Sequence, residues 1–130
     1  MTNGKRKEQL KKVAENYFDS FKTKSFATIP YSDDVVLRAP IAPGGVHFPI
    51  KGKQEVFTQW WKPLEPALEG VSIKIIDQFY NDSLTGIIAK ADFTLAGPGI
   101  TLRVADLFFV NEEGKITEQE NHFDASPLRG

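Results

Sequence analysis

The chain contains no cysteine among its 130 residues. This absence excludes a disulfide framework, a thiol nucleophile and any cysteine-based zinc or iron–sulfur site. Histidine is also scarce, since only His47 and His122 are present, and a histidine-rich metal site is therefore not expected. Nothing in the sequence implies a metal ion or an organic cofactor.

The sequence also lacks long apolar runs and an excess of charge of either sign. No segment approaches the ~20 consecutive apolar residues that a membrane span needs, and the polar N-terminus shows no secretory signal. The formal net charge of −1 gives no general attraction to nucleic acid or to a membrane surface. With 41% hydrophobic and 25% charged residues, we expect residues 1–130 to form one soluble domain in the cytoplasm.

The N-terminal segment has the pattern of an amphipathic helix. Apolar residues recur at helical spacing over residues 10–21, and Tyr17 lies on that apolar face. Thr2 or Asn3 is placed to cap the start of the helix. The basic residues between positions 5 and 12 have no recognisable nucleic-acid motif around them, and we interpret them as a solvated helix face.

A second helical pattern follows Gly52, with apolar residues at positions 56, 57, 60, 61 and 64. Proline has no backbone N–H and clashes with the preceding helical turn. The regular helix is therefore expected to end near Trp61 or Lys62, before Pro63 and Pro66.

From residue 71 onward the period of the apolar residues changes from 3.6 to 2. Four runs rich in β-branched and aromatic residues, joined by short turns, predict an antiparallel meander. A short strand is expected at 35–38 after a turn at 31–34, and an edge strand broken by a proline at 46–50. This arrangement predicts an α+β fold, with helices packed on one face of a strongly bent, mainly antiparallel sheet. The four runs are 71–80, 84–95, 100–110 and 116–123.

The run at 100–110 carries a carboxylate on its apolar face. Asp106 shares its alternation with Val104 and Phe108, so it is expected to point into apolar surroundings. A buried carboxyl without a partner has a raised pKa and stays protonated, and it can then donate a hydrogen bond to a ligand oxygen. The alternative is a structural role in which Asp106 accepts bonds from a backbone donor or from Tyr17.

The last strand also turns polar residues inward. Alternation places Gln119, Asn121 and Phe123 on the face of Asp106. Buried polar groups need hydrogen-bond partners, and a cavity filled with water or ligand supplies them. We therefore predict a small-molecule pocket in which Gln119 and Asn121 orient the ligand. Its apolar walls are expected to be Phe18, Phe57, Trp60, Trp61 and Phe123.

Together these features resemble the nuclear transport factor 2-like superfamily, which includes ketosteroid isomerases, SnoaL-like polyketide cyclases and limonene-epoxide hydrolases. The resemblance rests on the helix that carries Tyr17, on residues 33–36 leading to Pro40, on Gly52, and above all on ADLFFVNEEGKI at 105–116. It implies a cystatin-like cone and a homodimer through the convex face of the sheet. It says little about activity, because this fold hosts many functions.

The resemblance also implies roles for individual residues. In the ketosteroid isomerases a helix tyrosine and a protonated aspartic acid form an oxyanion hole, and Tyr17 and Asp106 stand at those positions. The base of those isomerases is an aspartate directly before a proline, where this chain has Ala39. A steroid-type proton shuttle therefore lacks its base.

The hydrolases and cyclases of the superfamily place an acidic residue on the last strand. Asn121 matches that position, and a shift of one residue would bring His122 to it. An amide orients a water or a carbonyl but takes up no proton at neutral pH. The catalytic set would thus be Tyr17, Asp106 and Asn121, with His47, His122 or the substrate itself as the base.

Two functions remain as hypotheses. The first is a protein that binds a small apolar carbonyl or hydroxyl compound and acts as a cofactor-independent isomerase, cyclase or hydratase through an enolate. The second is a non-catalytic ligand-binding or accessory interaction domain that kept the cone and lost the base. A role in nuclear transport finds no support in charge or composition. A homodimer is expected, because Leu107 and Phe109 would otherwise be exposed.

Overall fold

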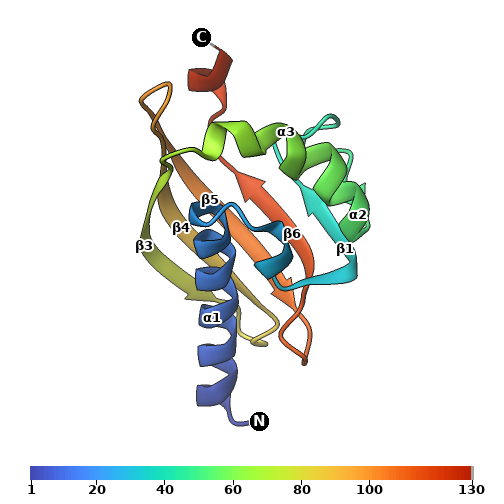
Figure 1. The fold of residues 1–130 in the computed structure, drawn as a ribbon. Helices are drawn as coiled ribbons and strands as arrows, with labels where there is room; N and C mark the ends of the chain where they lie inside the picture. The colour runs from blue at the N-terminus through green and yellow to red at the C-terminus, as the bar shows by residue number, and fades with distance from the viewer. Residues whose placement is uncertain (130) are drawn as a thin grey trace.

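One long helix, α1 (Asn3–Lys22), crosses the concave side of a curved six-stranded sheet in the computed structural model, which describes residues 1–129 (Figure 1). Thr2 caps the helix, as predicted, because its Oγ1 accepts the backbone N–H of Lys5 at 3.2 Å. A short 3₁₀ turn, η1 (Phe26–Thr28), leads from the helix to the sheet. The buried face of α1 consists of Leu10, Val13, Ala14, Tyr17, Phe18, Ser20 and Phe21.

The second helical segment is longer than the sequence pattern predicted. It runs through α2 (Lys53–Val56), the π-helical turn η2 (Phe57–Trp61), α3 (Lys62–Leu64) and the 3₁₀ turn η3 (Glu65–Leu68). The expected end near Trp61 or Lys62 was wrong. The π turn ends at Trp61, two residues before Pro63. It therefore contains the residue four positions before the proline, whose carbonyl a proline clashes with in a regular helix.

The sheet has the order β2-β1-β6-β5-β4-β3. Strands β3 to β6 form the predicted antiparallel meander, and the only parallel pair among the described strands is β1 with β6. The α+β fold with a bent, mainly antiparallel sheet is therefore confirmed. The strands are β1 (Tyr31–Arg38), β2 (Ile50–Lys51), β3 (Ser72–Tyr80), β4 (Gly86–Leu95), β5 (Ile100–Val110) and β6 (Ile116–His122).

Two local predictions about β1 and β2 were wrong. Residues 31–34 belong to β1 rather than to a turn, because Tyr31 pairs with Ile116 and buries its ring in the core. Of the run 46–50, only Ile50 belongs to a strand, the short β2 that it forms with Lys51. The carbonyl of Val46 instead accepts a hydrogen bond from Arg38 Nη1 at 2.8 Å.

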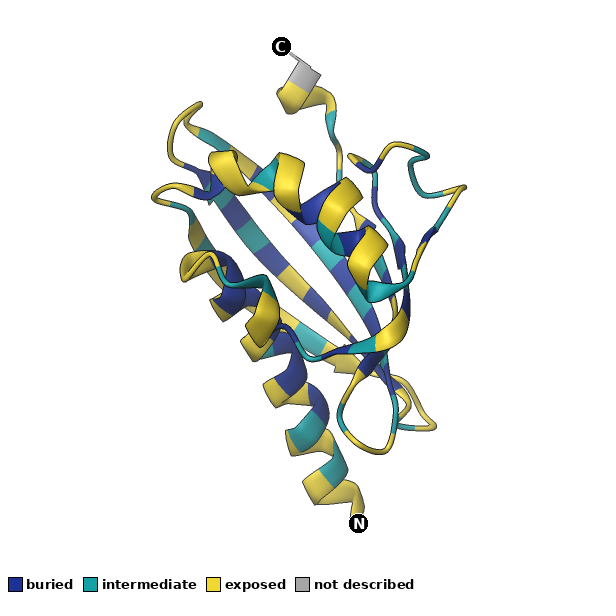
Figure 2. Ribbon diagram, turned by 45° about the vertical axis from the view of Figure 1, so that its right-hand side comes forward, coloured by how far each residue is buried: buried dark blue, intermediate teal, exposed yellow. Residues whose placement is uncertain are grey.

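Burial alternates along the long strands, as Figure 2 shows. The concave face packs on the helices, and it buries Ala89 and Phe93 of β4 together with Val104 and Phe108 of β5. The convex face is open. The predicted inward alternation of β5 and β6 is confirmed, because Asp106, Gln119 and Asn121 are all buried.

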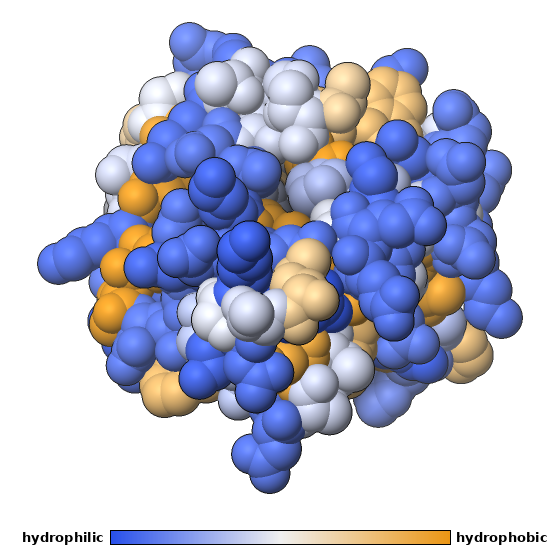
Figure 3. All heavy atoms as spheres, turned by 90° about the horizontal axis from the view of Figure 1, so that it is seen from below, coloured by the Kyte–Doolittle hydropathy of each residue, from blue (hydrophilic) through white to orange (hydrophobic). Residues whose placement is uncertain are grey.

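The interpretation of the basic residues 5–12 as a solvated face was wrong for Arg6. Its guanidinium is partly buried and donates to the carbonyls of Leu84, Val110 and Asn111 at 2.8, 2.6 and 2.9 Å. These carbonyls belong to two hairpin turns of the sheet. The outer surface at this N-terminal end of α1 is mostly hydrophilic (Figure 3).

Candidate functional site

A cavity of about 140 Å³ lies between α1, the segment from η2 to η3, and the concave face of the sheet. Ile41 and Leu128, each more than a third exposed, lie at its mouth, and Leu128 comes from the C-terminal 3₁₀ turn η4 (Ser126–Arg129). The lining is apolar except for Tyr17, Asp106 and Asn121. The other lining residues are Phe21, Trp60, Leu64, Ala67, Phe93, Leu95, Leu102, Val104 and Phe123.

Asp106 reaches this cavity because of the alternation of β5. It pairs with Ala89 on one side and Asn121 on the other, and it is 4% exposed. Its Oδ1 has no hydrogen-bond partner among the residues that the structure describes. Burial raises the pKa of this carboxyl from 3.8 to about 8. At neutral pH Asp106 is therefore mostly a neutral acid that can donate a hydrogen bond.

Gln119 organises the polar groups beside Asp106. Tyr31 donates its hydroxyl proton to Gln119 Oε1 at 2.7 Å. The Nε2 of Gln119 donates to the hydroxyl oxygen of Tyr17 at 3.1 Å and to Asn121 Oδ1 at 2.9 Å. Because the Tyr17 oxygen accepts this bond, its own proton is available to a group in the cavity.

Both tyrosines of this network stay protonated. Burial raises the pKa of Tyr17 and of Tyr31 well above the ordinary value, and a negative charge on Asp106 would raise both further. Hydrogen bonds of both tyrosines with Gln119, and of Tyr17 with Asn121, lower the pKa values but are outweighed. Tyr17 and Asp106 are thus two neutral donors on one wall of an apolar cavity.

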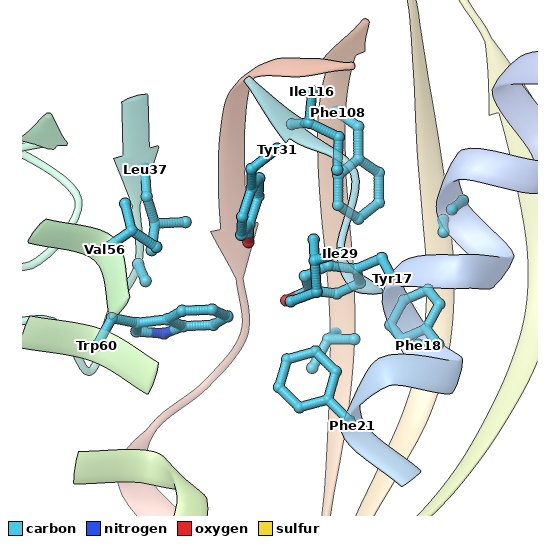
Figure 4. Packing of buried hydrophobic residues seen from close by; sticks show 14 of the residues in the cluster. Tyr17, Phe18, Phe21, Ile29, Tyr31, Leu37, Val56, Trp60, Phe108 and Ile116 are labelled. Atoms are coloured by element: carbon cyan, nitrogen blue, oxygen red, sulfur yellow. The ribbon is translucent and has the colours of Figure 1, made fainter. Parts of the chain in front are cut away.

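The structure brings together only part of the expected apolar wall. Trp60 and Phe123 line the cavity, and in the close-up the ring of Trp60 points toward the same space as the hydroxyls of Tyr17 and Tyr31 (Figure 4). Phe18 and Trp61 are fully buried in the core and Phe57 packs on Phe26. None of these three lines the cavity.

Gln119 stands behind the cavity rather than in its wall, since it contacts Tyr17 and Tyr31 without lining the space. Tyr31 is a polar member of the site that the sequence analysis missed, because it was assigned to a turn. The polar residues 32–34 after it give no local strand signal, because their composition is that of a turn.

Neither histidine lines the cavity. His47 is exposed in the loop between β1 and β2. His122 is exposed on β6, and its Nε2 lies 3.3 Å from Glu120 Oε1. Ala39, which stands at the position of the isomerase base, is completely buried. Among the described residues, Tyr17 and Asp106 are the only titratable groups in the cavity wall, so neither histidine belongs to the site that we propose.

Other features give no competing site. A hollow of about 590 Å³ beside Arg6 is wider, but hairpin turns and the first residues of α1 line it, and the Arg6 guanidinium already binds carbonyls. No three His, Cys, Asp or Glu side chains of the described chain are grouped as metal ligands. None of its helices has the length and apolar character that crossing a membrane demands.

Comparison with known proteins identifies the family. A family model described as the SnoaL-like domain matches residues 14–119, and the chain therefore belongs to the SnoaL-like family. No curated protein matches the sequence.

Solved structures show the same fold at low sequence identity. A SnoaL-like protein of unknown function from Burkholderia thailandensis has a TM-score of 0.73 at 12% identity, with 90% of this chain and 95% of that chain covered. A protein of unknown function with a cystatin-like fold from Methylobium petroleophilum has a TM-score of 0.70 at 15% identity, with 89% of this chain and 76% of that chain covered.

A steroid delta-isomerase from Pseudomonas aeruginosa has a TM-score of 0.67 at 16% identity, with 93% of this chain and 84% of that chain covered. At such identities the likeness shows the fold alone. The match to the SnoaL-like family model, together with this shared fold, confirms the predicted nuclear transport factor 2-like superfamily.

Proposed function

We propose that this SnoaL-like protein binds a small, mostly apolar organic compound through a carbonyl or hydroxyl oxygen. Tyr17 and Asp106 hold that oxygen, and Asn121 lies beside them in the same wall. The observation that carries the proposal is the carboxyl of Asp106, which is neutral, buried and unpartnered at Oδ1, in the wall of an apolar cavity.

The chemistry of these donors suits an oxygen that gains negative charge. The described cavity wall holds no base, so a base from solution or on the substrate itself takes the proton from the carbon next to a carbonyl. The charge then moves to the oxygen and forms an enolate. Two fixed donors in an apolar site stabilise such an oxyanion by a few kcal/mol. The proposed activity is therefore isomerisation, cyclisation or hydration of an enolisable compound. The fold of the steroid delta-isomerase is consistent with it.

Phenol is a suitable probe of the proposed oxygen site, because its hydroxyl mimics an enol. In isothermal titration calorimetry, Tyr17→Phe and Asp106→Leu should each weaken phenol binding about tenfold, since each removes one hydrogen bond to the ligand oxygen. Tyr80→Phe removes a hydroxyl from a tyrosine on β3, outside the cavity wall, and serves as the matched control. Unchanged affinity in both cavity variants would contradict the proposal.

A second candidate function is binding without turnover. It is favoured by a specific observation: the described cavity wall holds hydrogen-bond donors but no carboxylate or imidazole that is free to act as a base. Deuterium exchange next to the carbonyl of cyclohexanone, followed by NMR in D2O, separates the two candidates. Exchange that depends on Tyr17 and Asp106 supports the enzyme, and binding without exchange supports the ligand-binding domain.

We also propose a homodimer formed through the convex face of the sheet. Phe79, Ile88 and Leu107 are neighbours in register across β3, β4 and β5, and Phe79 is 54% exposed. Phe109 continues the same face of β5. Contiguous apolar side chains on an open sheet face are typical of an interface, and a second copy of the chain is the partner that would cover them.

A further inference from the structure

Unpartnered polar atoms gather at the cavity. In the described part of the chain, three buried side-chain atoms have no hydrogen-bond partner: Asp106 Oδ1, Trp60 Nε1 and Gln78 Oε1. Two of these three belong to residues that line the one cavity described above. Buried polar groups in folded proteins are nearly always paired. Two exceptions on residues of one cavity wall indicate a ligand that would supply both missing partners.

Trp60 differs in this respect from its neighbour Trp61. The indole N–H of Trp61 donates to Glu65 Oε2 at 2.9 Å, four residues further along the chain. The indole N–H of Trp60 has no such acceptor, although the side chain is only 3% exposed. Bulk water therefore has little access to it, and the cost of leaving the donor unpaired persists until a ligand or a trapped water reaches it.

Packing fixes the direction of the Trp60 ring. It meets the ring of Phe21 edge to face at 5.9 Å and lies 6.2 Å from the ring of Trp61. Both tryptophans belong to the π-helical turn η2, and such turns occur frequently at functional sites. A rigid donor in a cavity wall selects ligands by the position of their acceptors.

The volume of the cavity limits the ligand. It measures about 140 Å³, and an apolar protein cavity of about 150 Å³ holds one benzene ring. A compound of four fused rings would extend beyond this volume, out through the mouth of the cavity. The wall offers donors at Tyr17 and Asp106 from α1 and β5, and a separate donor at Trp60 from η2.

We infer that the ligand is a single-ring compound with two oxygen acceptors, one held by Tyr17 and Asp106 and the other by the indole N–H of Trp60. This inference rests on the proposed function, and it adds the size of the ligand and its second polar group. Trp60 thus determines specificity, because a ligand without the second acceptor leaves its N–H unpaired.

Hydroxybenzaldehydes and vinylphenols test the inference as matched probes. The 3- and 4-isomers of each carry a phenolic hydroxyl, and the aldehyde oxygen of one is replaced by a CH₂ group in the other. Trp60→Phe should weaken binding of at least one hydroxybenzaldehyde about tenfold and change that of the corresponding vinylphenol less than threefold. The aldehyde and vinyl groups give the phenolic hydroxyls different acidities. Comparing the affinity of one compound for the wild type with its affinity for the variant removes this effect. Trp61→Phe is the control, because its indole donates to Glu65 away from the cavity.

The outcomes separate this inference from the proposed function. If Trp60→Phe weakens the binding of each hydroxybenzaldehyde and its corresponding vinylphenol equally, or weakens neither, the proposed role of Trp60 is overturned. Tyr17→Phe, measured with the same compounds, reports on the oxygen site independently. Failure of all four probes to bind the wild-type protein would overturn the assignment of a single-ring ligand. Thermal unfolding of each variant confirms that the fold is retained.

Discussion

Asp106 links the stability of this protein to pH through a single proton. Its pKa is raised from 3.8 to about 8 by burial in the folded state. Between these values the folded protein holds a proton that the unfolded chain releases. Stability therefore falls as the pH rises through this window, by up to about 1.4 kcal/mol per pH unit. Below about pH 4 Asp106 is protonated in both the folded and the unfolded state, so its burial no longer makes stability depend on pH.

Asp106→Asn should remove this pH dependence, because an amide does not ionise. We expect the variant to match the wild type near pH 4 and to exceed it by a margin that grows toward pH 8 and then levels off. By pH 8 the difference should reach several kcal/mol, on the order of a third or more of the stability of a typical domain. Urea unfolding at a series of pH values measures it.

Asp33→Asn is the matched control for this experiment, because Asp33 lies exposed on β1. It makes the same change from carboxylate to amide outside the core, and its free energy of unfolding is measured at the same pH values. A pH-independent difference between Asp106→Asn and the wild type would mean that Asp106 is ionised in the folded protein, and it would remove the basis of the proposed oxygen site.

Residues of the site were predictable from sequence where strand alternation alone decides their burial. Asp106, Gln119 and Asn121 face inward because side chains alternate on a strand. Sequence could not distinguish Trp60 from Trp61, since both lie on the apolar side of one helical segment. Which indole finds an acceptor depends on the π turn and on Glu65.

At the scale of elements, Arg6 joins α1 to two hairpin turns of the sheet. Its position in the first helical turn is unfavourable for a cation, because the helix dipole places positive charge there, and the first turn holds no acidic residue. Its bonds to Leu84, Val110 and Asn111 offset this cost. One of these residues, Leu84, has a positive φ of 55°, which is uncommon for a residue other than glycine. The Nε of Arg6 donates to the carbonyl of Leu84 in this conformation.

Arg6→Ala should lower the free energy of unfolding by about 2 kcal/mol, because three carbonyls lose a charged donor. Arg6→Lys should recover less than half of this loss, since an ammonium group lacks the planar arrangement of donors. Chemical denaturation measures the loss, and hydrogen exchange should quicken at residues 81–86 and 111–115. Lys7→Ala, at an exposed position of the same helix, should have little effect. Full recovery in Arg6→Lys would contradict a role for the guanidinium geometry.

Local sequence patterns predicted some of the turns and strands correctly but missed others. The short turns after β3 and β5 were predicted between the alternating runs. Each contains an asparagine, a residue that favours turns, and the Oδ1 of Asn81 and of Asn111 accepts backbone N–H groups at its own turn. The start of β1 was missed, because pairing with β6 overrides the polar residues Asp33 and Asp34. Such long-range pairing leaves no trace in local periodicity.

At the scale of the whole molecule, the curvature of the sheet gives its two faces different roles. The concave face encloses the core and the cavity, while the convex face carries the apolar row of Phe79, Ile88 and Leu107. Local sequence indicated this row only through alternation on single strands. Its continuity depends on the register between strands, which sequence does not specify directly.

Leu107→Glu or Phe109→Glu should convert the proposed dimer into monomers, because a carboxylate in the centre of an apolar interface loses its hydration without gaining a partner. Sizing chromatography with light scattering measures the mass in solution. Phe48→Glu is the matched control: Phe48 is 73% exposed but lies in the loop before β2, outside the convex face. A dimer that persists in both convex-face variants would place the interface elsewhere. Monomers in the control as well would indicate that added charge alone separates the subunits.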